Sequence, residues 1–222
     1  MNKKEKWLCS VIGLFIMISI ILAVSFKEKI LIGAGKFMAP ESSLTEGMAD
    51  VVILEGTGTI GKGVVAKGIE LLSSGQAKHM AIVLHSIGKN HWPFAFHEDY
   101  PSSVKMELQK LGLKDSDFTI IVTPIRNPVT LTSAKGALQI LAKDRIKEAI
   151  LVSPGFHMRR SFLVYQHLSL PLKIKIYPVA CFDRYQLNDW WSHDYGPRDF
   201  LLELQKLALY MAKGYIPLKI SY

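Results

Sequence analysis

The sequence predicts an α/β protein with a Rossmann-like, three-layer fold, in which helices cover both faces of a mostly parallel five-stranded sheet. Apolar runs short enough for strands buried on both faces alternate with longer segments of helical spacing. The strands are expected at residues 49–56, 79–87, 118–124, 147–154 and 172–180. The helices are expected at residues 61–75, 102–113, 127–144, 159–168 and 198–214. Such alternation implies right-handed crossovers and therefore parallel strands.

Glycines and aperiodic stretches separate these elements. The first predicted helix places Val65, Ile69 and Leu72 on one face and ends at Gly75, a residue that commonly closes helices. Residues 88–101 have no period and are expected to form a long loop. In sheets of this class ligands bind outside the carboxyl ends of the strands, so the loops that follow the strands are where a binding site is expected.

The N-terminal segment predicts a membrane anchor ahead of the domain. Residues 7–26 carry no charge, and about 20 apolar residues suffice for one transmembrane helix. Residues 1–6 are the more basic flank, which predicts a cytoplasmic tail, an inner (plasma) membrane location and an extracytoplasmic domain. A cleaved signal peptide is the alternative, because residues 23–25 form an acceptable cleavage site.

The rest of the chain is long enough for one domain, expected at residues 49–222 after a linker at residues 27–48. The two cysteines are Cys9, inside the predicted anchor, and Cys181, so we expect neither an intradomain disulfide nor a metal site. The net charge of +8 is spread along the chain. With an anchor present, it favours an anionic membrane or cell-wall neighbour over nucleic acid.

A glycine-rich turn follows the first predicted strand. Gly56, Gly58 and Gly61 fit the pattern G-x-G-x-x-G, and with Lys62 they come close to a phosphate-binding P-loop. A P-loop needs Ser or Thr where this chain has Gly63, and no acidic residue ends the second strand to bind a ribose. We therefore interpret the turn as a backbone anion site rather than a classical nucleotide site.

The stretch from Ile150 to Ser161 carries the strongest functional signal. A buried strand breaks there, and His157, Arg159 and Arg160 follow before an apolar helix. Arginines in the first turn of a helix oppose its dipole, a cost that is explained if the pair binds an anion. The helix amides would add to the grip, and the histidine could donate a hydrogen bond or a proton.

Three further motifs have both a structural and a functional interpretation. Thr130 is expected to cap a helix or to direct its hydroxyl into the strand-end cleft. Glu98 and Asp99 could assist His157 in acid/base chemistry or be merely solvated. The adjacent tryptophans at residues 190–191 could pack under the last helix, lie at a membrane interface or stack on a ligand.

The chain resembles the YdcF-like family of envelope proteins. The matching stretches are residues 49–58, 67–84, 128–141 and 149–161, and the last of these closely resembles the family's strand–histidine–arginine signature. Ser133 stands where the family has asparagine, so the chain resembles a divergent member. The resemblance implies a Rossmann-like fold, a role in peptidoglycan or lipid-carrier metabolism and, from one branch of the family, S-adenosylmethionine as a possible ligand.

Three hypotheses follow for function. The first is a membrane-anchored domain that binds an anionic, phosphorylated metabolite or lipid-linked envelope precursor through the glycine turn, Thr130, His157 and the two arginines. The second is a hydrolase or transferase on a phosphorylated glycan or lipid, with His157 and Glu98 as catalytic residues. The third is a non-catalytic envelope scaffold, which would show an open apolar patch and no enclosed pocket at the strand ends.

Overall fold

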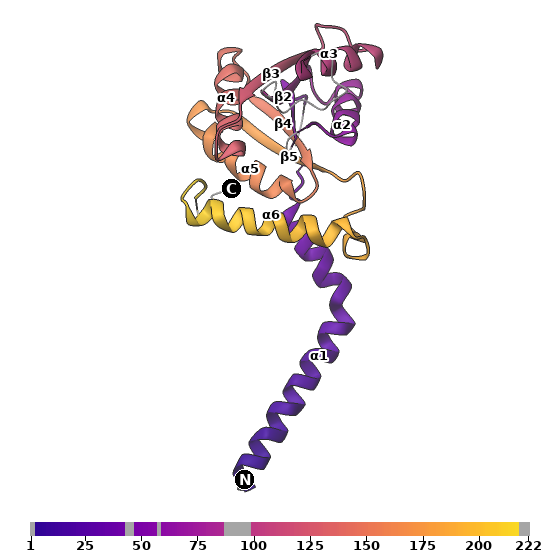
Figure 1. The fold of residues 1–222 in the computed structure, drawn as a ribbon, viewed down its shortest axis with the longest axis vertical. Helices are drawn as coiled ribbons and strands as arrows, with labels where there is room; N and C mark the ends of the chain where they lie inside the picture. Colours follow the sequence, from indigo (N-terminus) through magenta and orange to yellow (C-terminus); the bar gives the residue numbers. More distant parts are fainter. Residues whose placement is uncertain (1–2, 43–46, 57–58, 87–98, 218–222) are drawn as a thin grey trace.

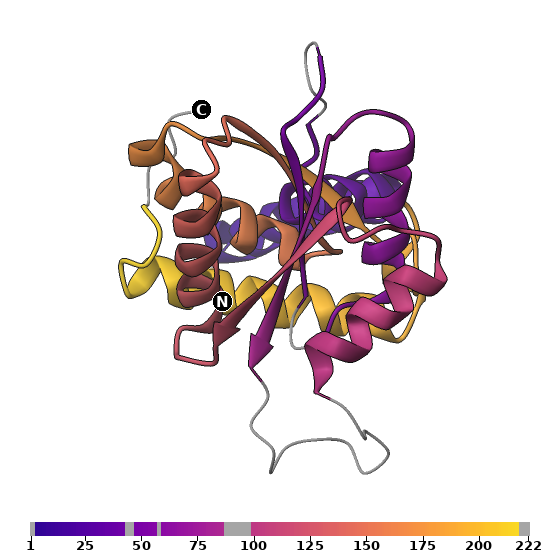
Figure 2. The same ribbon diagram turned by 90° about the horizontal axis from the view of Figure 1, so that it is seen from above.

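A computed structural model describes residues 3–42, 47–56, 59–86 and 99–217 of the chain. Its central sheet has five strands in the order β3-β2-β1-β4-β5, and every neighbouring pair is parallel. The strands are β1 (Val51–Glu55), β2 (Met80–Ser86), β3 (Phe118–Pro124), β4 (Glu148–Pro154) and β5 (Lys175–Cys181). All five lie within two residues of the segments predicted from sequence, apart from the later start of β5. The predicted three-layer α/β fold is confirmed (Figures 1 and 2).

Helices follow the strands in the alternation that the sequence predicts. They are α2 (Lys62–Ser73), α3 (Tyr100–Lys110), α4 (Val129–Lys143), α5 (His157–Ser169) and α6 (Tyr195–Ala212). Three of them begin earlier than predicted: α3 begins at Tyr100, α5 at His157 and α6 at Tyr195. These early turns lie outside the apolar periodicity that identified the helices.

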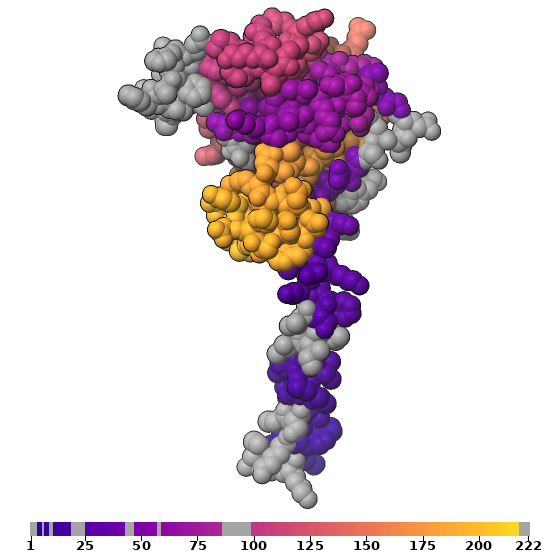
Figure 3. Space-filling model, turned by 90° about the vertical axis from the view of Figure 1, so that its right-hand side faces the viewer, coloured from indigo at the N-terminus to yellow at the C-terminus, as the bar shows by residue number. Residues whose placement is uncertain are grey.

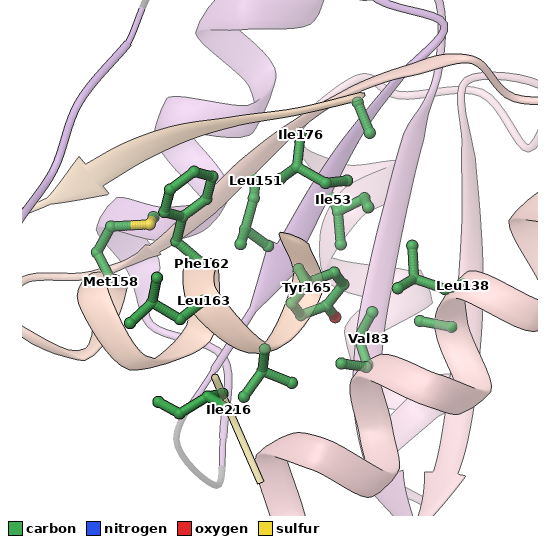
Figure 4. Packing of buried hydrophobic residues seen from close by; sticks show 14 of the residues in the cluster. Ile53, Val83, Leu138, Leu151, Met158, Phe162, Leu163, Tyr165, Ile176 and Ile216 are labelled. Atoms are coloured by element: carbon green, nitrogen blue, oxygen red, sulfur yellow. The ribbon is translucent and has the colours of Figure 1, made fainter. Parts of the chain in front are cut away.

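Each face of the sheet has a hydrophobic core of its own because residues alternate between faces along a strand. On one face Val52 and Leu54 pack towards α2 and α3. On the other face Val51 and Ile53 pack towards α4, α5 and the final helix. Figure 4 shows this second core, with Tyr165 of α5 close to Ile53 and Val83. Burial on both faces explains why the strands are continuously apolar.

The strand order reverses between β1 and β4, so this is the point where a ligand is expected in an open parallel sheet. At their carboxyl ends β1 finishes with Glu55 and β4 leads through Pro154 and Gly155 into His157, the first residue of α5. A buried acid and a buried histidine are therefore brought to the same edge of the sheet. The fold thus places the strongest sequence motif at its topological switch point.

The N-terminal helix α1 (Lys3–Met38) differs from the prediction, since residues 27–38 of the expected linker continue it. No helix within the described residues has both the length and the apolar character that a bilayer crossing requires. The end of α1 is joined to the domain: Met38 is buried in the core, and the indole nitrogen of Trp190 donates a 3.1 Å hydrogen bond to the carbonyl of Leu31. Contacts with the domain explain why residues 27–38 do not behave as a linker.

Trp190 resolves one choice that the sequence left open. It is buried and stacks on Phe200 of α6, with 4.6 Å between ring centroids and 14° between planes. Its backbone belongs to the short 3-10 turn η3 (Trp190–Ser192). Its side chain contacts Leu31 of α1 and Phe200 of α6, so it packs between α1 and the start of the last helix. Figures 1 and 3 show α6 lying across the end of the domain from which α1 departs.

Candidate functional site

A cluster of buried charged side chains lies at the carboxyl edge of the sheet. Glu55 comes from the end of β1, His157 and Arg160 from the first turn of α5, Glu203 from the middle of α6, and Thr130 from the first turn of α4. All five are at most 7% exposed. Charged groups are rarely buried to this extent unless they are paired, so the contacts among them define the site.

Arg160 is held by contacts with side chains of two other helices, α4 and α6. Its Nε donates to Oε2 of Glu203 at 2.9 Å, and its Nη2 donates to Oε1 at 3.2 Å. Its Nη1 donates to the hydroxyl of Thr130 at 2.5 Å, and the guanidinium lies 4.9 Å from the ring centroid of Tyr210. A bidentate arginine–carboxylate pair is the strong, directional form of this interaction. Arg160 is therefore a fixed positive charge rather than a mobile surface arginine.

His157 lies between two carboxylates. Its Nδ1 is 3.2 Å from Oε2 of Glu203 and 2.9 Å from Nη2 of Arg160. One ring nitrogen cannot satisfy both neighbours: with a proton it donates to Glu203, and without one it accepts from Arg160. Its Nε2 lies 4.0 Å from Oε2 of Glu55. His157 therefore has a carboxylate on each of its sides.

The two carboxylates have opposite acid–base character. Burial raises the pKa of Glu55 above its usual value, although His157 and the hydrogen bond from the Ser161 hydroxyl partly oppose this. Burial would also raise the pKa of Glu203, but the hydrogen bond and charge of His157, together with Arg160, hold it well below its usual range. A buried acid with a raised pKa beside a histidine is a frequent feature of functional sites.

A cavity of about 450 Å³ opens beside this cluster, and we call it the basic cavity. Its charged lining residues are Arg160, Lys206 and Lys213, and the lining includes no Asp or Glu among the described residues. Lys213 is exposed and has no ion-pair partner in the described part of the chain. The His85 ring also lines this cavity, and its Nε2 is buried without a hydrogen-bond partner among the residues described. The cavity therefore offers donors and positive charge to an anion.

A second cavity of about 500 Å³ lies on the other side of His157, and we call it the mixed cavity. Its lining contains Asp183, Asp199 and Glu203 as well as arginines. Asp183 accepts a 3.3 Å hydrogen bond from the backbone N–H of Gly63 at the start of α2. A Cβ on residue 63 would require the exposed Asp183 carboxylate to move, so glycine at this position permits the contact. The chain thus supplies its own anion at the helix terminus where the sequence predicted a bound one.

The sequence-predicted residues are distributed unequally over these features. Gly56 lines the basic cavity and Gly61 the mixed cavity, so they do not form one cradle. Gly58 and Glu98 lie outside the described residues. Thr130 does not cap α4, whose N-cap is Pro128; its hydroxyl instead accepts from Arg160, as the alternative interpretation expected of a hydroxyl in the cleft.

The two adjacent arginines do not act as a pair. The Arg159 guanidinium lies 4.3 Å from the ring centroid of Phe37, on the α1 side of the domain, and Arg159 lines neither cavity. Neighbouring residues on a helix point about 100° apart, so only one of the two can face the cluster. The structure therefore brings Arg160, but not Arg159, to the lining of the basic cavity.

Sequence reasoning missed Glu55, His85 and Glu203 as site residues. Glu55 could have been found as the single acid in the otherwise apolar strand β1. Glu203 shares the buried face of α6 with Leu207 and Tyr210, at helical spacings of four and seven. His85 ends the apolar part of β2. A charged residue at an apolar-periodic position was the available signal in each case.

No protein-family model, curated protein or solved structure shows significant similarity to the chain. The resemblance to the YdcF-like family thus stays a prediction. Within the described residues no three His, Cys, Asp or Glu side chains gather as they would around a metal ion.

Proposed function

We propose that this protein is a membrane-anchored, extracytoplasmic domain that binds a small anionic molecule, such as a phosphorylated envelope metabolite or lipid-linked precursor, in the basic cavity. One observation carries the proposal: Arg160, Lys206 and Lys213 line the same cavity at the switch point of a parallel sheet, and no carboxylate among the described residues lines it. A volume of about 450 Å³ lies in the range of small-molecule sites.

The electrostatic balance of the cavity favours an anion. Glu203 pairs with both Arg160 and Lys206, the latter at 2.9 Å, and so offsets part of their positive charge from behind the cavity wall. Lys213 adds a charge that no described carboxylate offsets. His85 adds a buried nitrogen that a ligand could contact. A net positive, largely preformed site of this kind concentrates anionic ligands.

The anchoring part of the proposal rests on the sequence of α1. Residues 7–26 are uncharged, and the described side chains between Trp7 and Ile18 in this stretch are exposed although most are large and apolar. Apolar side chains exposed in this way are favoured in a bilayer rather than in water. The more basic flank before them predicts an extracytoplasmic domain.

Phosphate binding by the full-length protein in detergent tests the cavity. Titration calorimetry with inorganic phosphate and with pyrophosphate should show binding that weakens about tenfold, or roughly 1.4 kcal/mol, when Lys213→Glu reverses the charge at the cavity. Lys135→Glu makes the same change on an exposed part of α4 outside the cavity and serves as the control. Equal binding by the wild type and the Lys213 variant would contradict the proposal.

A hydrolase or transferase acting on a phosphorylated glycan or lipid is the second candidate. The observation that favours it is the 3.2 Å contact between His157 and Glu203, because a carboxylate that orients a histidine is a common arrangement for proton transfer. Glu203 would thus take the assisting role that the sequence gave to Glu98. Phosphate release from p-nitrophenyl phosphate should then require His157 and be lost in His157→Gln while phosphate binding persists. Equal release by both proteins would exclude this role.

The YdcF-like resemblance adds two elements to the proposal. It favours a role in peptidoglycan or lipid-carrier metabolism, and it makes S-adenosylmethionine a ligand to include among the titrated compounds. The non-catalytic scaffold has less support at the strand ends, where two partly open cavities with polar and charged lining residues lie.

A further inference from the structure

We propose that the outward face of α6 lies on the surface of an anionic lipid bilayer, in the headgroup layer. This inference rests on the proposed anchoring by α1, and it adds a second membrane contact that the anchor alone does not require. The argument depends on three features of α6: an exposed apolar face, the placing of its charges, and the contacts that fix its position relative to α1.

The outward face of α6 is apolar. Leu201 is 56% exposed, Leu204 38% and Leu209 53%, and Leu202 beside them is 45% exposed. Exposed Ala208 and Ala212 fall on the same face at helical spacing. Single exposed leucines are ordinary, but a row of them along one helix indicates a surface that meets another apolar phase.

The charges of α6 are separated by face. Its two acidic residues, Asp199 and Glu203, are turned towards the domain, where each is in contact with arginine. The basic residues Arg198 and Lys213 are exposed near the two ends of the apolar face. Within α6 the apolar residues face outward beside the exposed Arg198, and the two exposed capping residues, Asp194 and Lys213, carry one charge of each sign. Outward apolar residues with basic neighbours are typical of helices that lie in anionic membrane interfaces.

The contacts between α1 and the domain fix the distance of α6 from the uncharged segment of α1. This distance sets the depth that we expect for α6 relative to the bilayer. Trp190, five residues before α6 begins, donates its hydrogen bond to the carbonyl of Leu31. Leu31 lies five residues beyond Phe26, the end of the uncharged segment, which is about 8 Å along a helix. The headgroup layer on each side of a bilayer is roughly 5–8 Å thick. The start of α6 is therefore expected at the level of the headgroups.

The relative positions of the two helices agree with this height. Figures 1 and 3 show α6 across the end of the domain from which α1 leaves, so the outward face of α6 is turned in the direction of α1. Stacking of Arg159 on Phe37 adds a second point of contact between α1 and the domain. Lys206 and Lys213 extend from α6 into the lining of the basic cavity, which would place the cavity rim beside the lipid headgroups.

A lipid surface fits this face better than a second copy of the chain does. Two copies that met through α6 would bring two exposed basic residues from each copy, Arg198 and Lys213, into the same interface, where the one exposed acid of each helix is its N-cap Asp194. Anionic headgroups supply that negative charge. Self-association remains a measurable alternative outcome.

The test uses the full-length chain in nanodiscs, with Cys9→Ser and Cys181→Ser so that a single cysteine can be labelled. A fluorescent probe at Leu204→Cys on α6 is compared with one at Met106→Cys on α3, which is exposed at the far end of the domain (Figure 1). In discs that contain phosphatidylglycerol, the Leu204 probe should become about tenfold less accessible to acrylamide than in detergent, as for a side chain buried roughly 5–10 Å into the interface. The Met106 probe should not change.

A matched pair of charge variants tests the role of the surface. Gln205→Glu introduces a negative charge on the exposed face of α6 and should restore much of the accessibility of the Leu204 probe. Gln139→Glu makes the same change on an exposed position of α4 and should have no effect. Loss of protection when phosphatidylcholine replaces phosphatidylglycerol would further support an anionic surface.

The outcomes separate this inference from the proposed function. If the chain co-purifies with the discs and the Leu204 probe remains as accessible as in detergent, the docking of α6 is wrong and the anchor stands. If the chain does not associate with the discs, the proposed anchor is wrong, and the docking that depends on it is also overturned. If the probe is protected in detergent by a dimer, a second copy covers this face instead.

Discussion

The two sides of His157 differ sharply in how they treat a buried carboxylate. On the side of α6, Glu203 accepts hydrogen bonds from Arg160 and Lys206, and its pKa is held low in spite of burial. On the side of β1, Glu55 has a hydroxyl donor from Ser161 and a histidine at 4.0 Å, and burial raises its pKa. Two deeply buried carboxyl groups thus have pKa values that are shifted in opposite directions.

This difference indicates that charged neighbours, more than burial, set the direction in which the pKa of each carboxyl group is shifted. Arg160 and Lys206 form ion pairs with Glu203, whereas Glu55 has the neutral hydroxyl of Ser161 as its hydrogen-bond donor and His157 at 4.0 Å. An ionised carboxylate in an apolar environment costs several kcal/mol unless charged partners compensate it. His157, placed between the two, lies within hydrogen-bonding distance of Glu203 and 4.0 Å from Glu55.

Removing the charge of Glu203 should have the largest effect on stability. Glu203→Gln leaves Arg160 buried without its ionic partner, and we expect a loss of about 3–5 kcal/mol in the free energy of unfolding, measured by urea denaturation. Glu107→Gln is the control because Glu107 also pairs with a lysine, at 2.6 Å, but both side chains are exposed. Exposed pairs contribute at most about 1 kcal/mol. Similar losses in the two variants would show that the Glu203 side is not a strongly coupled site.

Removing the carboxyl of Glu55 should have a smaller effect on the free energy of unfolding. This effect should change with pH in the direction opposite to that of Glu203. A carboxyl whose pKa is raised by folding contributes stability below its unfolded pKa of about 4.5, and this contribution is lost as pH rises through the folded pKa. Glu55→Gln should therefore gain stability relative to the wild type between pH 4.5 and 8. For Glu203, with its lowered pKa, the stabilising contribution is instead lost as pH falls below about 4.5.

Denaturation of the wild type and both glutamine variants at about pH 3, pH 4.5 and pH 8 measures these two signs: the Glu203 contribution should change between the two lower values and the Glu55 contribution between the two upper ones. The free energy of unfolding of Glu55→Gln, relative to that of the wild type, should be greater at pH 8 than at pH 4.5. The reason is that the variant has no carboxyl at position 55 to ionise. A constant difference across this range would mean that Glu55 ionises in the folded protein as it does in the unfolded chain, and the contrast between the two sides would disappear.

Arg159 should show the smallest effect, and it provides the baseline for its neighbour. Arg159→Ala removes stacking on Phe37, which is worth about 0.5–1 kcal/mol at a partly exposed site. Phosphate affinity should not change, because Arg159 lines neither cavity. Thermal unfolding and phosphate titration of Arg159→Ala measure the two quantities. A weakened affinity comparable with that of Lys213→Glu would place Arg159 functionally with the basic cavity.

Local pattern was sufficient to predict the layers and the edge of the sheet where the site lies. Strands buried on both faces are continuously apolar, and a parallel sheet brings the ends of β1 and β4 together, so Glu55 and His157 had to be near neighbours once the strand order was fixed. The pattern could not separate Arg159 from Arg160, because the direction of each side chain depends on how α5 is rotated against its neighbours. It also could not show that residues 27–38 continue a helix, since contacts with Trp190 and the domain core stabilise that part.

The sequence by itself determined the α/β class, the five parallel strands and the stretch from Ile150 to Ser161 as the centre of the site, because each depends on periodicity or on one short motif. Only the tertiary structure decided which groups meet there. Glu203 lies 43 residues from Arg160 and Asp183 lies 120 residues from Gly63. The electrostatic partners at these two points are carboxylates of the chain itself, and they come from distant segments that the hydrophobic cores bring together.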